Sequence, residues 1–248
     1  MATILRRRGL PRPDPDAMTL TEHLGELRRR LIVSVAAFAA ALVVAYLAYP
    51  RILRFFEHPY CQVQPHHCGL YVTGPLDLFT VRLDVAGYGG LALASPVILY
   101  ELWRFVTPGL KANEKRYAIP FALASALLFC VGAFVAWLTF PHALAFFHAV
   151  GGNLHAIFTA QRYLTLILAL MAIFGITFEF PVVLISLELA GVLTPRRLAH
   201  WRRWAIVLIV VFSAVVTPSS DPFSMLAMAV PMILFYEASI IVGRLLKR

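Results

Sequence analysis

Three carboxylates lie where an acidic side chain is rare or costly in this sequence. Glu26 sits in an arginine-rich amphipathic stretch, Glu114 follows a Pro-Gly break between two long apolar runs, and Glu179 falls near the middle of another apolar run. A carboxylate accepts two parallel hydrogen bonds from a guanidinium, so Glu26 and Glu114 are suited to binding a cation. An ionisable group inside an apolar span is costly to insert, so Glu179 marks a candidate functional site.

Each carboxylate also has a purely structural interpretation. Glu26 can pair with the arginines at 28–30 within one topogenic helix. Glu114 can complement the dipole of a helix that Asn113 caps. Glu179 can form a hydrogen bond between helices inside a bundle. The residues taken one at a time leave both interpretations open.

The elements that position these residues must lie in lipid. The chain of 248 residues is 60% hydrophobic and 14% charged, with a mean hydropathy of +0.76, which leaves too little polar surface to cover a water-soluble globule. The apolar runs are Leu31–Tyr49, Phe79–Trp103, Tyr117–Phe140, Tyr163–Val192, Trp204–Val216 and Phe223–Val242. We therefore predict an all-α polytopic membrane protein with six transmembrane helices.

The last two spans are short and are separated by a tight turn. The turn, residues 217–222, contains Asp221 between serine and proline and cannot continue a helix. The 204–216 run reaches only about 20 Å at 1.5 Å per residue, so either the bilayer thins or Trp201 and Trp204 are drawn inward. Glu188 and Glu237 lie near span ends, where their carboxylates can reach the interface, and are weaker candidates than Glu179.

Charge gives the orientation. The net charge is +9 and the isoelectric point is near 9.9, but the basic residues stand in short clusters between apolar runs, which indicates membrane topology rather than nucleic-acid binding. With a cytoplasmic amino terminus, all but four of the 22 Lys and Arg residues fall inside; the exceptions are Arg51, Arg54, Arg82 and Arg162. Both termini are therefore expected in the cytoplasm. We interpret residues 1–17 as a disordered tail and 18–248 as one six-helix domain.

The first outer loop carries two of the three cysteines. Cys61 and Cys68 lie where oxidising conditions permit a disulfide, which we expect. A metal site that adds His66 and His67 is the alternative, but four ligands within eight residues match no standard zinc spacing. Cys130 falls inside a span and is interpreted as a small core residue.

An amphipathic segment precedes the first span. Residues 19–22 fit a capping box, and leucines recur at helical spacing from 20 to 31, which predicts a helix along the membrane surface. Enzyme motifs are missing from the sequence: it contains no phosphate-binding Gly-Lys loop, no His-Glu-x-x-His and no Gly-x-Ser-x-Gly. We expect neither catalysis nor a cofactor.

Several separated motifs resemble one family when read in order. They are residues 23–31 (HLGELRRRL), 95–110 (SPVILYELWRFVTPGL) with Glu114, 178–181 (FEFP), and Thr217-Pro followed by residues 221–224 (DPFS). Over about Met18 to Arg248 the chain resembles TatC, the large subunit of the twin-arginine protein translocase. The resemblance implies a glove-like bundle with cytoplasmic termini and short last helices.

The resemblance also implies a function and a set of site residues. TatC proteins recognise the twin-arginine signal peptide of folded cargo and, with single-span TatA and TatB partners, form a translocase driven by the proton motive force in the bacterial cytoplasmic membrane. The family's signal-binding positions match Glu26, Arg28, Phe105 and Glu114. Its intramembrane glutamate matches Glu179, which is implicated in partner-helix contact.

Some features depart from the family or favour another function. Met225 stands where the family often has a glutamine that helps bind a partner helix, and the turn before it is one residue longer than usual. The resemblance assigns no transport role to Cys61 and Cys68. A proton-coupled secondary transporter that uses Glu179 is the alternative, although no half of the chain repeats. A structural scaffold is a third hypothesis.

Overall fold

Helices account for nearly all of the described chain. The computed structural model describes residues 20–63, 69–106, 118–151, 159–219 and 221–246. Within these ranges the helices are α1 (Leu20–Leu47), α2 (Tyr49–Val63), α3 (Pro75–Val106), α4 (Ala118–Gly151), α5 (Ala160–Thr177), α6 (Phe180–Leu189), α7 (Pro195–Val216) and α8 (Pro222–Leu246). The all-α prediction is confirmed.

Six helical segments among the described residues are long and apolar enough to cross a membrane, with α5 and α6 forming one of them. The last two are the shortest, at 22 and 24 residues, as predicted. The fifth is nevertheless longer than its apolar run, because α7 begins at Pro195 and includes an arginine-rich first half. Thr194 caps it by accepting a hydrogen bond from the Arg197 backbone N–H at 3.3 Å.

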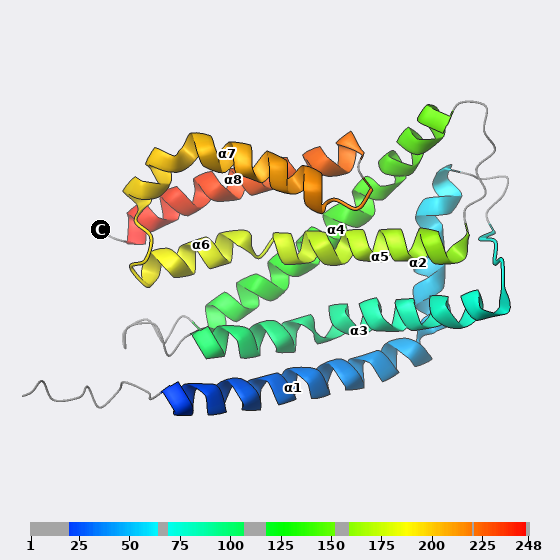
Figure 1. The fold of residues 1–248 in the computed structure, drawn as a ribbon, viewed down its shortest axis with the longest axis horizontal. Helices are drawn as coiled ribbons and strands as arrows, with labels where there is room; N and C mark the ends of the chain where they lie inside the picture. The colour runs from blue at the N-terminus through cyan, green and yellow to red at the C-terminus, as the bar shows by residue number, and fades with distance from the viewer. Residues whose placement is uncertain (1–19, 64–68, 107–117, 152–158, 220, 247–248) are drawn as a thin grey trace, which may run out of the picture.

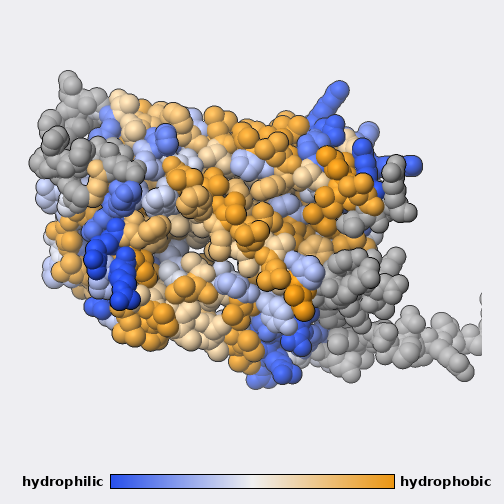
Figure 2. All heavy atoms as spheres, turned by 180° about the vertical axis from the view of Figure 1, so that it is seen from behind, coloured by the Kyte–Doolittle hydropathy of each residue, from blue (hydrophilic) through white to orange (hydrophobic). Residues whose placement is uncertain are grey.

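The helices lie side by side, with α4 crossing them. In Figure 1, α1, α3, the α5–α6 pair and the α7–α8 pair follow one another across the bundle, and both ends of the described chain lie at the same end. Both ends of the described chain therefore lie on one side, as two cytoplasmic termini require, and which side this is stays a prediction. Figure 2 shows a mostly apolar surface with hydrophilic residues gathered toward the two ends, as a lipid-facing protein requires.

Two glycines allow helices to approach closely. A Cβ added at Gly90 would lie 2.8 Å from the Leu42 Cα, and one at Gly132 would lie 2.6 Å from the Phe174 carbonyl oxygen. Small residues let helix backbones meet in a membrane, where van der Waals contact drives association. Gly90 therefore fixes the α1–α3 contact, and Gly132 fixes the α4–α5 contact.

One sequence prediction about helices was wrong, and one helix was not predicted. The segment before the first span is not a separate surface helix, because α1 runs unbroken from Leu20 to Leu47 and no proline interrupts it. In the first outer loop, the structure has the amphipathic helix α2, which is too short for a span. Its buried face holds Phe56 and Tyr60, and the Tyr163 hydroxyl donates to the Phe56 carbonyl oxygen at 2.7 Å.

The fourth span is broken in the middle. Residues Phe178 and Glu179 separate α5 from α6, and Pro181 stands in the first turn of α6. Proline has no N–H to donate and its ring displaces the carbonyl four residues earlier, so the helix kinks before it. Glu179 thus lies at the kink rather than on a regular helix.

Candidate functional site

An ion-paired cluster joins the first turns of α1 to the last turns of α3. Arg30 Nε donates to Glu26 Oε1 at 3.0 Å, and Arg30 Nη2 contacts the same oxygen. Arg30 Nη1 donates to Glu101 Oε2 at 2.9 Å. One guanidinium therefore holds two carboxylates from different helices.

The charges of this cluster do not cancel. Two carboxylates and one guanidinium leave a net charge of −1, and the three side chains are only 13 to 18% exposed. Glu26 Oε2 is buried and has no hydrogen-bond partner among the described residues. An unsatisfied buried acceptor is costly, by about 1–3 kcal/mol, so a donor that reaches Oε2 gains free energy.

An aromatic stack covers the open oxygen. The His23 and Phe105 rings stack with their centroids 4.4 Å apart and their planes 15° apart. His23 Nδ1 lies 4.0 Å from Glu26 Oε2, and the His23 side chain is 42% exposed. The structure thus brings together Glu26 and Phe105, two of the predicted site residues, whereas Arg28 is exposed and Glu114 lies outside the described residues.

The register of two antiparallel helices explains this meeting. Gly90 of α3 lies against Leu42 of α1. From that contact, a similar number of residues leads back along α1 to Glu26 and forward along α3 to Phe105. Equal rise per residue in both helices then places the two side chains at the same level.

Sequence reasoning missed Glu101 and the role of Arg30. The spacing of four residues between Glu26 and Arg30 is a signal for a pair within one helix. No comparable signal links Arg30 to Glu101, which is 71 residues away in the sequence and meets it only through helix packing.

Glu179 lies beside a groove within the bundle. The groove has a volume of about 490 Å³, and its lining includes Ser95, Phe129 and Met232 as well as Glu179. Both carboxylate oxygens of Glu179 are buried without a hydrogen bond to a described residue. Ser125 lies near this carboxyl group and accepts a hydrogen bond from Trp103 Nε1 at 2.5 Å.

Other predicted site residues have local structural partners. Glu237 forms a two-point ion pair with Arg202, at 2.6 Å from Nε and 2.8 Å from Nη2. Asp221 caps α8 by accepting from the Ser224 backbone N–H at 2.7 Å, and its second oxygen is buried without a partner in the described chain.

Two of the three cysteines lie among the described residues. Cys61 is disulfide-bonded. Cys130 is free and exposed on α4, so its interpretation as a core residue was wrong. Cys68, His66 and His67 lie outside the described residues, so the Cys61–Cys68 pairing stays a prediction. The described part of the chain contains no group of three His, Cys, Asp or Glu side chains that could hold a metal ion.

The fold and the cluster define a class of protein: a multi-pass membrane protein that offers partly buried carboxylates at one end of its bundle. The family profile described as "Sec-independent protein translocase protein (TatC)" matches residues 22–231. The chain belongs to the TatC family.

Curated relatives agree with this assignment. The chain is 42% identical to the "Sec-independent protein translocase protein TatC" of Frankia casuarinae over 91% of its own length and 65% of that protein. It is 37% identical to the protein of the same name from Aquifex aeolicus, covering 93% of this chain and 97% of that one. The chain thus spans less than two thirds of the Frankia protein but nearly all of the Aquifex protein.

A solved structure shares the fold. The "Crystal Structure of Twin Arginine Translocase Receptor- TatC" superposes with a TM-score of 0.75 and 36% sequence identity, and the match covers 91% of this chain and 100% of that one. The predicted six-span TatC fold is therefore confirmed. Family membership also favours a translocase component over the secondary-transporter alternative.

Proposed function

We propose that this chain is the receptor subunit of a twin-arginine protein translocase and that Glu26 binds an arginine of the signal peptide. The observation that carries this proposal is the open acceptor in a cluster of net negative charge. Oε1 of Glu26 is held by Arg30, while Oε2 has no hydrogen-bond partner among the described residues and has only His23 Nδ1 near it, at 4.0 Å. An incoming guanidinium supplies the missing positive charge and the missing donor.

Access to the open oxygen requires a side chain to move. The His23 ring lies over Oε2 but is itself 42% exposed, so it can rotate away toward solvent. Rotation would free the face of Phe105, on which a planar guanidinium can stack. Arginine is favoured over lysine at such a site because only the guanidinium combines stacking with directed hydrogen bonds.

The second arginine of the signal is assigned to Glu114, with Arg28 beside the site. Both assignments rest on the family resemblance, since Glu114 lies outside the described residues and Arg28 is exposed. We place both termini and this cluster on the cytoplasmic side of a bacterial cytoplasmic membrane, where a precursor with an uncleaved signal is found.

Glu179 is assigned a later step. Its buried carboxyl group, with the Ser125 hydroxyl nearby, lies beside an apolar groove and can accept a hydrogen bond from a polar group of a single-span TatA or TatB helix. Glu237 is a weaker partner-helix contact, because Arg202 must release it first. Transport through the assembled complex would draw on the proton motive force, and several copies of this chain are expected in that complex.

Peptide binding tests the receptor function. Purified protein in detergent is titrated with a labelled Arg-Arg signal peptide and with its Lys-Lys version. We expect clear preference for Arg-Arg, lost in Glu26→Gln and kept in the matched control Glu57→Gln, a carboxylate on α2 at the other end of the bundle. Equal binding of the two peptides by the unmodified chain would refute the proposal.

A further inference from the structure

A second groove opens between α6 and α7. Its volume is about 850 Å³, in the range of roughly 300–1,000 Å³ typical of ligand sites. Phe180 and Leu184 of α6 form one wall, α7 forms the other, and Met232 and Tyr236 of α8 lie on the floor. The groove exists because α6 and α7 both pack on α8 more than on each other.

The groove runs from the cytoplasmic end toward the middle of the membrane. Along α7 its lining extends from Arg197 to Phe212. At 1.5 Å per residue this is about 22 Å, compared with about 15 Å of hydrocarbon in one leaflet. One end therefore lies at headgroup level, and the other lies near the bilayer midplane.

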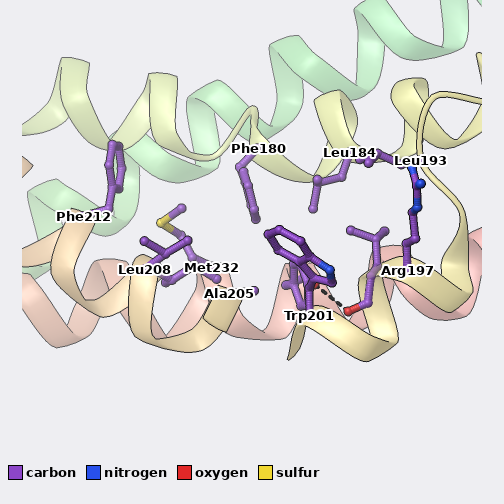
Figure 3. A pocket seen from close by; sticks show the side chains of 12 residues that line it. Phe180, Leu184, Leu193, Arg197, Trp201, Ala205, Leu208, Phe212 and Met232 are labelled. Atoms are coloured by element: carbon purple, nitrogen blue, oxygen red, sulfur yellow. Dashed lines mark hydrogen bonds between the residues drawn. The ribbon is translucent and has the colours of Figure 1, made fainter. Parts of the chain in front are cut away.

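The headgroup end is cationic and the rest is apolar. Figure 3 shows Arg197 at the end beside Leu193, with Trp201 and Phe180 further along. Arg197 is exposed, and no ion pair joins it to another described residue, whereas the neighbouring Arg202 is paired with Glu237. The amino-terminal end of the 22-residue α7 lies at the same end and adds the positive pole of its dipole.

We propose that this groove binds an anionic phospholipid, with its phosphate at Arg197 and the first turn of α7 and with one acyl chain along the groove. Basic pockets between transmembrane helices on the cytoplasmic side have this chemistry. Trp201 has the position of an interfacial aromatic at headgroup level. The phosphate supplies the counter-charge that Arg197 lacks within the described chain.

A partner helix fits the same groove less well. Helices pack in membranes through small residues that let backbones meet. Here the walls carry Trp201, Phe180 and Phe212, and Ala205 is the small residue among the lining side chains. A flexible chain of methylene groups can fill the space between such large side chains, whereas a helix would have to pack its own side chains against them without close backbone contact.

Lipid retention tests the proposal. The full chain is placed in detergent with equal amounts of phosphatidylglycerol and phosphatidylcholine of the same acyl composition, and retained lipid is measured by native mass spectrometry. We expect one lipid per chain, with phosphatidylglycerol favoured at least fivefold. Arg197→Gln should bring the ratio near one. Arg196→Gln is the matched control, since Arg196 is an exposed neighbour that does not line the groove, and should keep the preference.

Crosslinking identifies the occupant in membranes. A photoreactive residue at Leu208, which lines the groove and is 60% exposed, should capture phospholipid more than one at Val207, which is 54% exposed and does not line it. The proposal is overturned if Arg196→Gln and Arg197→Gln reduce the preference equally, or if both lipids are retained alike. It is also overturned if Leu208 crosslinks mainly to a protein segment.

Discussion

Neutralising Glu101 should weaken signal-peptide binding although Glu101 is not assigned a contact with the peptide. In the structure Arg30 divides its guanidinium between Glu26 and Glu101. With Glu101→Gln, Arg30 keeps only one charged partner and is drawn fully to Glu26. The net charge of the cluster then rises from −1 to zero, so an incoming guanidinium meets a carboxylate that is already neutralised.

The size of the effect follows from the hydrogen bonds. A bond to a charged acceptor contributes about 1.5–3 kcal/mol, and a neutral one about 0.5–1.5 kcal/mol. The substitution therefore favours Arg30 over the incoming guanidinium, as the partner of Glu26, by about 1–1.5 kcal/mol. The side chains are buried enough that solvent screening removes little of this difference. At 1.4 kcal/mol per tenfold, the Kd for an Arg-Arg peptide should rise roughly 5- to 10-fold.

A double variant separates electrostatics from packing. In Arg30→Gln with Glu101→Gln, Glu26 is again an uncompensated carboxylate and the cluster returns to −1, so most of the lost affinity should return. The assay is fluorescence titration of the purified variants, with thermal unfolding as a control for fold. Weaker binding by the double variant than by Glu101→Gln alone would refute the charge-balance reasoning, because it would mean that the ion pairs act by holding α1 on α3.

Three further substitutions have expected outcomes. Glu179→Ala should leave the Kd for an Arg-Arg peptide within twofold and should impair export of a reporter precursor. A loss of peptide binding as large as that of Glu26→Gln would refute the assignment of Glu179 to a later step. Gly132→Val should reduce the free energy of unfolding by roughly 1–3 kcal/mol through overpacking against Phe174, and should therefore lower the unfolding temperature in detergent. Gly87→Ala should not, because its Cβ meets open space. Asp221→Ala should cost about 1 kcal/mol through loss of the α8 cap, and Asp221→Asn should keep most of it; equal stabilities would contradict a capping role.

Composition and hydropathy were sufficient to predict the membrane-spanning architecture. In lipid the backbone must satisfy its own hydrogen bonds, so each long apolar run had to be a helix. The turn at 217–222 was predictable from its two prolines, because one follows the end of α7 and the other begins α8. Pro181 indicated a break near Glu179, but the angle of the kink depends on how α5 and α6 pack against their neighbours.

The composition of the site was harder to predict. Glu26 and Arg30 are neighbours on one helix, whereas their link to Glu101 depends on the α1–α3 register that Gly90 sets. A glycine within an apolar run has no sequence signature that names its partner. The helix α2 was missed because its amphipathic pattern is only 15 residues long and, without its packing partners, looked like a polar loop.

Burial explains how a carboxylate can select a cation at a strongly cationic surface. The chain carries a net charge of +9, and the two arginines that precede Arg30 in the sequence, Arg28 and Arg29, are exposed. Exposed charges are screened beyond about 8 Å at physiological salt, whereas Glu26 and Glu101 act over hydrogen-bond distances and are largely shielded from solvent. Distant cations therefore repel a basic signal only weakly, while the local deficit of one positive charge persists. Under the proposed function, a lysine would meet that deficit as a point charge. A guanidinium would also offer a planar fork of donors to Oε2 and a face to Phe105, so discrimination would depend on geometry rather than on charge.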